Sequence, residues 1–205
     1  MHKPYKTISK LFAAAVIIFG GFSVFAQGPT AEDYGPSYEA TLFVVLGSDD
    51  NAQRGSLPKA IDAVAKQIRD NFTFGSYRLM NTYYGRLANN GSLDYKSVSS
   101  LQNASSDIDS PTFLDWQLSN FRRDANSAGR PTLNMQAFRF GARVPLVISR
   151  LSADGGKTTP VTNYESVGLN LNRISIAENT PTLIGTISLP RTTGTFFLVL
   201  TIKPV

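Results

Sequence analysis

The chain has 205 residues, a formal net charge of +5, a single histidine at position 2 and no cysteine. A chain of this length can bury one substantial core, although without cysteine it must do so without disulfides. Beyond His2 it lacks imidazole and thiol groups, which excludes Ser-His-Asp and Cys-His catalytic groups and zinc sites built on nitrogen and sulfur ligands.

Residues 1–26 have the layout of a bacterial signal peptide. Three lysines form its positive segment, residues 11–19 are apolar, and a Ser-Val-Phe-Ala sequence ends at Ala26. We therefore predict cleavage between Ala26 and Gln27, followed by a flexible lead over residues 27–37. The alternative is an uncleaved membrane anchor, because the uncharged run around the apolar segment is long enough to span a bilayer.

Cleavage would place the protein in the periplasm or outside a bacterial cell, with no transmembrane segment remaining. The segment carries three lysines and no acidic residue, so its removal lowers the net charge from +5 to +2. Such a small charge gives no indication of nucleic-acid binding, and we predict none.

The first element after the lead is a strand over residues 38–46. Its apolar side chains fall on both faces, with Phe43 and Val45 opposite a longer apolar row. A strand that is apolar on both faces is typical of the interior of a sheet. The longer row consists of Tyr38, Ala40, Leu42, Val44 and Leu46.

A single convincing helix follows over residues 57–72, with Ser56 or Asp50 as its cap and Pro58 in its first turn. Its polar side carries charged residues, and its apolar stripe contributes roughly 1.5–3 kcal/mol for each buried side chain. Because so short a helix is marginal alone, we expect a sheet beneath it. The stripe is Leu57, Ile61, Val64, Ile68 and Phe72.

The rest of the chain alternates between strands and turns. After a strand over residues 76–87, Asn89-Asn90-Gly91 favours a tight hairpin, and residues 97–110 read as a polar loop. The pattern predicts an α+β domain over residues 38–205: a mainly antiparallel β-sheet with one amphipathic helix packed across a face. Alternating residues predict further strands over 114–118, 133–138, 144–151 and 167–172, and a last hairpin joining 183–189 to a central strand over 195–202.

Two pieces of the chain resemble bacterial secretins, the outer-membrane pores of secretion and pilus systems. The strand at 38–46, the helix at 57–72 and Tyr77-Arg78-Leu79 are similar to the small αβ ring-forming domains of that family. Glu178-Asn179-Thr180-Pro181-Thr182-Leu183-Ile184-Gly185-Thr186, followed by residues 197–204, is similar to its closing hairpin, although the usual Gly-Gly step reads Ile-Gly-Thr here. The resemblance implies assembly in the envelope and no catalysis.

Carboxylates are the remaining source of chemistry. Asp107 and Asp109, with Asp115 nearby, form one acidic cluster, and Asp49-Asp50-Asn51 forms another. Oxygen-rich loops can hold Ca²⁺, but neither cluster has the spacing of a calcium loop, so we interpret both as solvated. A glycosidase needs two carboxylates across a cleft, and any chain with fifteen acidic residues contains some pair. We predict no metal, no cofactor and no enzyme activity.

Arginines concentrate in the middle third of the chain, and strand pairing would bring several of them to one face. Such a face suits anionic partners, because guanidinium binds phosphate and carboxylate through two hydrogen bonds. The competing interpretation is a solvated strand surface that resists aggregation. Core packing explains most of the aromatic residues, and the rest would stack sugars or anchor a partner. The candidate binding surface consists of Arg122, Arg123, Arg139, Arg143, Tyr83, Tyr84 and Trp116.

The sequence thus predicts an exported, non-catalytic protein of a bacterial envelope. We expect a structural or accessory role in an envelope assembly such as a secretion or pilus apparatus, with other envelope proteins as partners. The first alternative is a periplasmic protein that binds a polysaccharide or another anion, such as an anionic glycan or a lipid headgroup. The second alternative is a carboxylate-based hydrolase.

Overall fold

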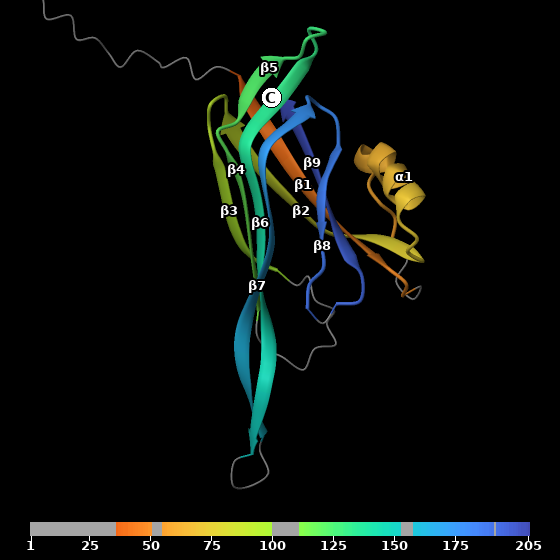
Figure 1. Ribbon diagram of the computed structural model, residues 1–205, viewed down its shortest axis with the longest axis vertical. Helices are drawn as coiled ribbons and strands as arrows, with labels where there is room; N and C mark the ends of the chain where they lie inside the picture. The colour runs from red at the N-terminus through yellow and green to blue at the C-terminus, as the bar shows by residue number, and fades with distance from the viewer. Residues whose placement is uncertain (1–35, 51–54, 100–110, 153–157, 191) are drawn as a thin grey trace, which may run out of the picture. The chain divides into compact units, whose positions relative to one another are not determined.

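The computed structural model describes residues 36–50, 55–99, 111–152, 158–190 and 192–205, and side chains are described outside 149–160 (Figure 1). These residues lie in one compact unit, Tyr34–Val205. The predicted signal peptide and nearly all of the lead lie outside the described residues, as do Asp107 and Asp109. No helix in the described part of the chain is long and apolar enough to cross a membrane.

The described elements are mainly strands with one short helix, which confirms the predicted α+β class. In chain order they are β1 (Ser37–Ser48), the 3₁₀ turn η2 (Lys59–Ile61), α1 (Asp62–Asn71), β2 (Ser76–Ala88), β3 (Leu93–Ser99), β4 (Thr112–Ser119), β5 (Arg122–Ala125), β6 (Pro131–Ser152), β7 (Thr158–Ala177), β8 (Thr182–Ile187) and β9 (Thr195–Pro204).

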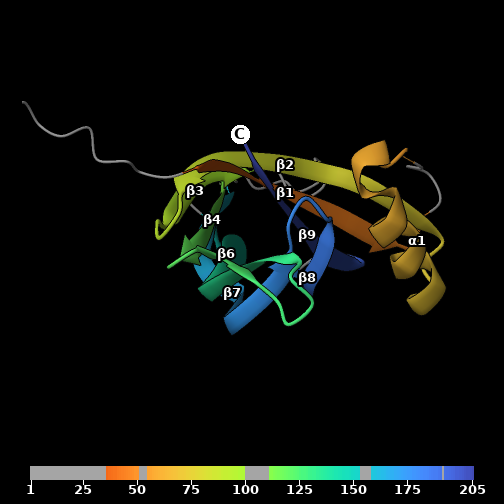
Figure 2. The ribbon, with the colours of Figure 1, turned by 90° about the horizontal axis from the view of Figure 1, so that it is seen from above.

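The strands form two antiparallel sheets rather than one. Sheet A has the order β2-β1-β9-β8, which confirms that β1 and β9 are interior strands. In sheet B, β3 pairs with β4, and β4 and β5 pair with successive stretches of one edge of β6. β7 pairs with β6 along the other edge. Figure 2 shows the two sheets facing each other.

The main core lies between the sheets. One face of β1 and β9 supplies a row of fully buried side chains, which contact those of β4 and β6. Trp116 and Phe138 are both 0% exposed there. The apolar row predicted for residues 38–46 faces this core.

The helix forms a third layer on the outer face of sheet A. Ile61, Val64 and Ile68 pack on Phe43 and other apolar side chains of that face, which confirms the predicted stripe. Figures 1 and 2 show α1 beside sheet A and away from sheet B.

The start of the helix differs from the prediction. The helical turns begin at Lys59, Pro58 is the capping residue, and no side chain makes a capping hydrogen bond. Ser56 and Asp50 are therefore not caps. The first turn is stabilised by tertiary packing instead, because Leu57 packs on the same cluster as the stripe.

The Asn89-Asn90-Gly91 turn does not close a hairpin. β2 belongs to sheet A and β3 to sheet B, so the turn carries the chain from one sheet to the other. Its backbone is bonded to the segment after β4: Asn90 N donates to Phe121 O (2.8 Å) and Phe121 N donates to Gly91 O (2.9 Å). Asn90 has a φ of 63°, the left-handed conformation that asparagine tolerates.

Candidate functional site

The structure divides the four candidate arginines between two faces of sheet B. Arg139 alternates with the buried Phe138 and therefore lies on the outer face, as do Arg122 and Arg143. Arg123 points the other way, where its Nε lies 2.6 Å from Glu178 Oε2. Arg143 also lies over a ring, with its guanidinium carbon 5.0 Å from the centre of Phe113.

The candidate aromatic residues do not form a surface. Tyr83 and Trp116 are 3% and 0% exposed, and both contact Tyr95 inside the core, at ring distances of 5.3 and 6.2 Å. Burial raises the pKa of Tyr83, whose hydroxyl donates to Ser99 Oγ. Both side chains face the core between the two sheets, so Tyr83 and Trp116 are not part of the candidate surface.

Tyr84 is exposed, but it lies on the outer face of sheet A, away from the arginines of sheet B. Its hydroxyl donates to Glu39 Oε2 (2.9 Å) and accepts from Arg86 Nε (3.2 Å). Glu39 also pairs with Lys203, whose Nζ lies 2.9 Å from Oε1. The hydrogen bond from Lys203, with that from Tyr84, holds the pKa of Glu39 below its ordinary value.

In three neighbouring strands of sheet B, the alternation of buried and exposed side chains changes phase at one level. Trp116 and Leu118 of β4 are buried at even positions, whereas Phe121, just after β4, is buried at an odd one. On β6, Phe138 is buried on one side of the level and Leu133, on the other alternation, is buried beyond it. β7 changes in the same way, with Leu169 packed on the core before the level and Ile176 after it. The reversal corrects the single alternation that we predicted across residues 133–138.

The level of reversal is marked by irregular backbone in adjacent strands. Asn120 has a φ of 48° and Arg173 a φ of 56°, both left-handed. Gln136 lies between them on β6, and the ladder pairs on either side of it skip this position. A change of side by one residue is what an inserted bulge does to a strand. Here the change occurs in step across the sheet.

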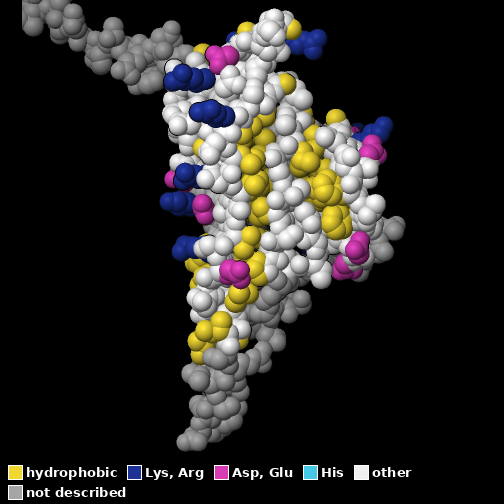
Figure 3. Space-filling view, viewed as in Figure 1, with side chains coloured by type: hydrophobic (Ala, Val, Ile, Leu, Met, Phe, Trp, Pro, Cys, Tyr) yellow, Lys and Arg dark blue, Asp and Glu magenta, His cyan; other side chains and the backbone are white. Residues whose placement is uncertain are grey.

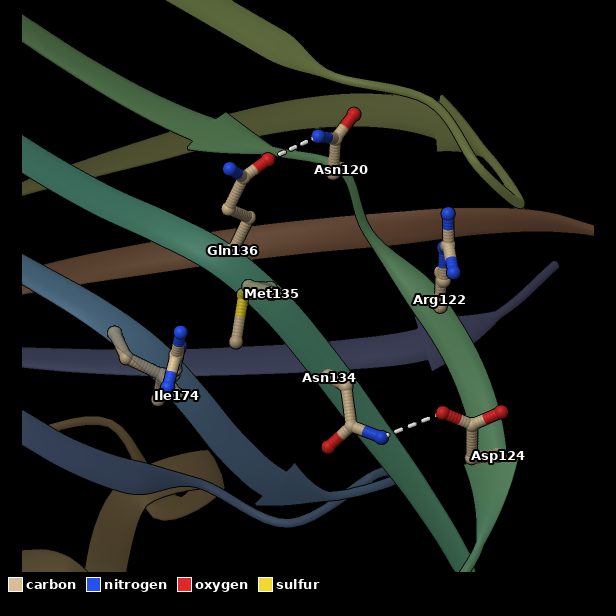
Figure 4. Close-up of a pocket in the computed structure, with 8 residues that line it drawn as sticks. Asn120, Arg122, Asp124, Asn134, Met135, Gln136 and Ile174 are labelled. Atoms are coloured by element: carbon tan, nitrogen blue, oxygen red, sulfur yellow. Dashed lines mark hydrogen bonds between the residues drawn. The ribbon is translucent and has the colours of Figure 1, made fainter.

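A depression of about 460 Å³ lies on the outer face at this level, and we call it the kink pocket. Figure 4 shows two hydrogen-bonded pairs that join neighbouring strands across it: Asn120 Nδ2 donates to Gln136 Oε1, and Asn134 Nδ2 donates to Asp124 Oδ2 at 2.6 Å. The pocket is lined by Asn120, Arg122, Asp124, Asn134, Met135, Gln136, Arg173 and Ile174.

Of these residues, only Arg122 belongs to the candidate binding surface predicted from the sequence. Asn120, Asn134, Gln136 and Arg173 are separated by up to 53 positions and meet only through strand register. One signal was present in the sequence: Phe138 and Phe140 fall on the opposite alternation from Leu133. Large apolar residues on both alternations of one strand indicate either two covered faces or a bulge.

A second exposed feature is the far end of the β6–β7 pair. β4 pairs with β6 only as far as Arg143. β7 continues to pair with β6 beyond that point, and the last pair is Ser152 with Thr158. We call this two-stranded stretch, residues 144–152 and 158–165, the β6–β7 ribbon. Figure 1 shows it extending beyond both sheets, and Figure 3 shows hydrophobic side chains continuing onto it.

Apolar side chains are exposed on and beside the ribbon. Ile148 is 65% exposed and Tyr164 is 38% exposed. The Tyr164 ring lies 5.6 Å from that of Phe113 on β4, and Phe113 pairs across the sheet with Val98, which is 65% exposed. Large exposed apolar side chains of this kind are typical of interaction surfaces.

The acidic clusters are placed as follows. Asp49 is exposed and accepts a hydrogen bond from Gly75 N (3.2 Å), which ties the end of β1 to the start of β2. Asp115 lies against Gly141 on the outer face of sheet B. Within the described residues, no three side chains of His, Cys, Asp or Glu lie together as metal ligands.

No protein-family model matches the chain, and no curated protein matches it.

Proposed function

We propose that this protein is an exported, non-catalytic component of a bacterial envelope assembly, such as a secretion or pilus apparatus. In this proposal the β6–β7 ribbon is its docking element, and the partner is another envelope protein. The single observation that supports the proposal most is the exposure of Ile148 and Tyr164 on a ribbon that pairs with no third described strand.

A two-stranded ribbon is marginally stable in water on its own. The β6–β7 ribbon pairs with no third described strand. Val144 at its base is buried in the core, but Ile148 and Tyr164 expose apolar side chains to solvent. A partner that covers Ile148 and Tyr164 would remove apolar surface from water, at about 25 cal/mol per Å². Docking therefore accounts for both the length of the ribbon and its composition.

The ribbon favours contact through side chains over the addition of a strand. Pro145 on β6 and Pro160 on β7 each lack a backbone N–H. Prolines on exposed strands reduce indiscriminate edge-to-edge pairing. We therefore place the partner against the Ile148 and Tyr164 side chains.

Site-specific photo-cross-linking tests the docking. A photoreactive residue replaces Ile148, and a control variant carries it at Lys66, an exposed position on α1. We expect one discrete adduct from position 148 in the envelope fraction, identified by mass spectrometry as a different envelope protein and lost when Tyr164→Ser is added. No adduct, the same adducts from position 66, or an adduct between two copies of this chain would each contradict the proposal.

Export is tested separately. The protein is isolated from an envelope fraction and its first residue is determined. We expect Gln27; an intact Met1 in the cytoplasmic fraction would contradict export without bearing on the ribbon.

A further inference from the structure

We propose that the kink pocket binds a carboxylated sugar, such as a uronate residue of an acidic polysaccharide. The pocket lies at the β5 end of β6, at the opposite end from the β6–β7 ribbon (Figure 1). The site therefore stands independently of the docking proposed above, and the two can fail separately.

The two arginines of the kink pocket favour an anionic ligand. Arg122 and Arg173 are exposed on the pocket, and neither makes a hydrogen bond or ion pair with the part of the chain that the structure describes. The carboxylate in the pocket, Asp124, is instead held by Asn134 at 2.6 Å. Two free guanidinium groups beside one engaged carboxylate leave the pocket positively charged and ready for a planar carboxylate.

The amide side chains of the kink pocket suit the hydroxyl groups of a sugar. Asn120 uses one N–H in its bond to Gln136, and Gln136 uses only its oxygen, so donors remain on both side chains. Amides that retain donors and acceptors match the hydroxyl groups of a sugar ring. Asp124 adds an acceptor for a hydroxyl proton and repels a doubly charged phosphate, which favours a carboxylated sugar over a free phosphate.

The backbone that holds these side chains is also typical of a functional site. A left-handed φ is uncommon for a residue other than glycine, and asparagine tolerates it better than arginine does. The chain nevertheless carries Arg173 at a φ of 56°, directly on the pocket. Strained residues of this kind concentrate at functional sites. The volume of about 460 Å³ also lies within the range of small-molecule sites.

Calorimetric titration of the purified exported protein tests the site. The probes are galacturonate, glucuronate and mannuronate oligosaccharides, each paired with its methyl-esterified form, and inorganic phosphate. We expect at least one uronate oligosaccharide to bind, its ester to bind about tenfold more weakly or not at all, and phosphate to compete poorly.

Three variants locate the binding. Arg122→Gln and Arg173→Asn should each weaken it about tenfold; asparagine keeps the preference for a left-handed φ, so Arg173→Asn should fold normally. Arg139→Gln changes an arginine on the same face outside the pocket and should leave the affinity unchanged. Failure of all uronates to bind, equal binding of the esters, equal competition by phosphate, or an equal loss in Arg139→Gln would overturn the proposal.

Discussion

Leu169 of β7 lies directly over Gly185 of β8, so that a Cβ added to Gly185 would come within 2.5 Å of Leu169 Cδ2. The opposite side of the molecule repeats this relationship, with Leu93 of β3 over Gly85 of β2 at 2.7 Å. In each case a leucine from an edge strand of sheet B packs over a glycine on an edge strand of sheet A. The described strands of the two sheets share no pairing, and these two contacts cover the core at its two edges.

We expect Gly185→Val to destabilise the protein by about 1–3 kcal/mol, because the added methyl groups must displace Leu169 from the core. Urea unfolding measures the change. The cost should shrink when the same substitution is made in a Leu169→Ala background, because the clash requires both side chains. Simple additivity of the two substitutions would contradict this packing.

Two glycines with positive φ differ in how well they would accept a larger residue. Gly194 has a φ of 133° and its added Cβ would overlap Gly47 O, whereas Gly129 has a φ of 71° and open space around it. We expect Gly129→Asn to be nearly neutral and Gly194→Asn to cost at least about 1–3 kcal/mol from strain alone. Thermal unfolding compares them, and equal losses would contradict the close approach of Gly194 to β1.

Trp116 is the single tryptophan of the chain, is fully buried, and has no hydrogen-bond partner for Nε1 among the described residues. Trp116→Ala should cost about 3–5 kcal/mol. Trp116→Phe should cost under about 1.5 kcal/mol, since it keeps most of the ring volume and removes a buried donor without a partner. Unfolding followed by circular dichroism tests both variants, and a phenylalanine variant as unstable as the alanine variant would show that the indole N–H contributes.

The Glu39 cluster makes stability depend on acidity. Because the folded pKa of Glu39 lies below its ordinary value, its ionised form stabilises the fold above that value, and the contribution is lost as the pH falls through the folded pKa. Glu39→Gln should therefore be less stable than the wild type at neutral pH and equal to it in strong acid. Asp70→Asn, on the exposed face of α1, is the control. A Glu39→Gln curve parallel to wild type at every pH would contradict the role of the cluster.

Local periodicity made the interior strand and the helix predictable. The expected strand over residues 38–46 differs from β1 by at most two residues at either end, and the apolar stripe of the helix is the one that packs on sheet A. Both elements are read correctly because each is decided by residues close together in sequence, whose burial follows from one period.

Features that depend on distant register were not predictable. The Asn89-Asn90-Gly91 turn has hairpin chemistry, yet its strands separate into two sheets, because β2 pairs with β1, which precedes it, and β3 pairs with β4, which follows it. The kink pocket requires Asn120, Gln136 and Arg173 to lie at one level, which only the registers of three strands determine. The burial of Trp116 likewise depends on a second sheet that single-strand alternation does not reveal.

The shared reversal in sheet B ties the evolution of three segments together. A residue deleted from the irregular point of β6 alone would turn the apolar side chains of half that strand outward, while its neighbours kept theirs inward. Compensation requires matching deletions beside Asn120 and Arg173. We therefore expect that a change of length at this level is tolerated only when all three segments change together.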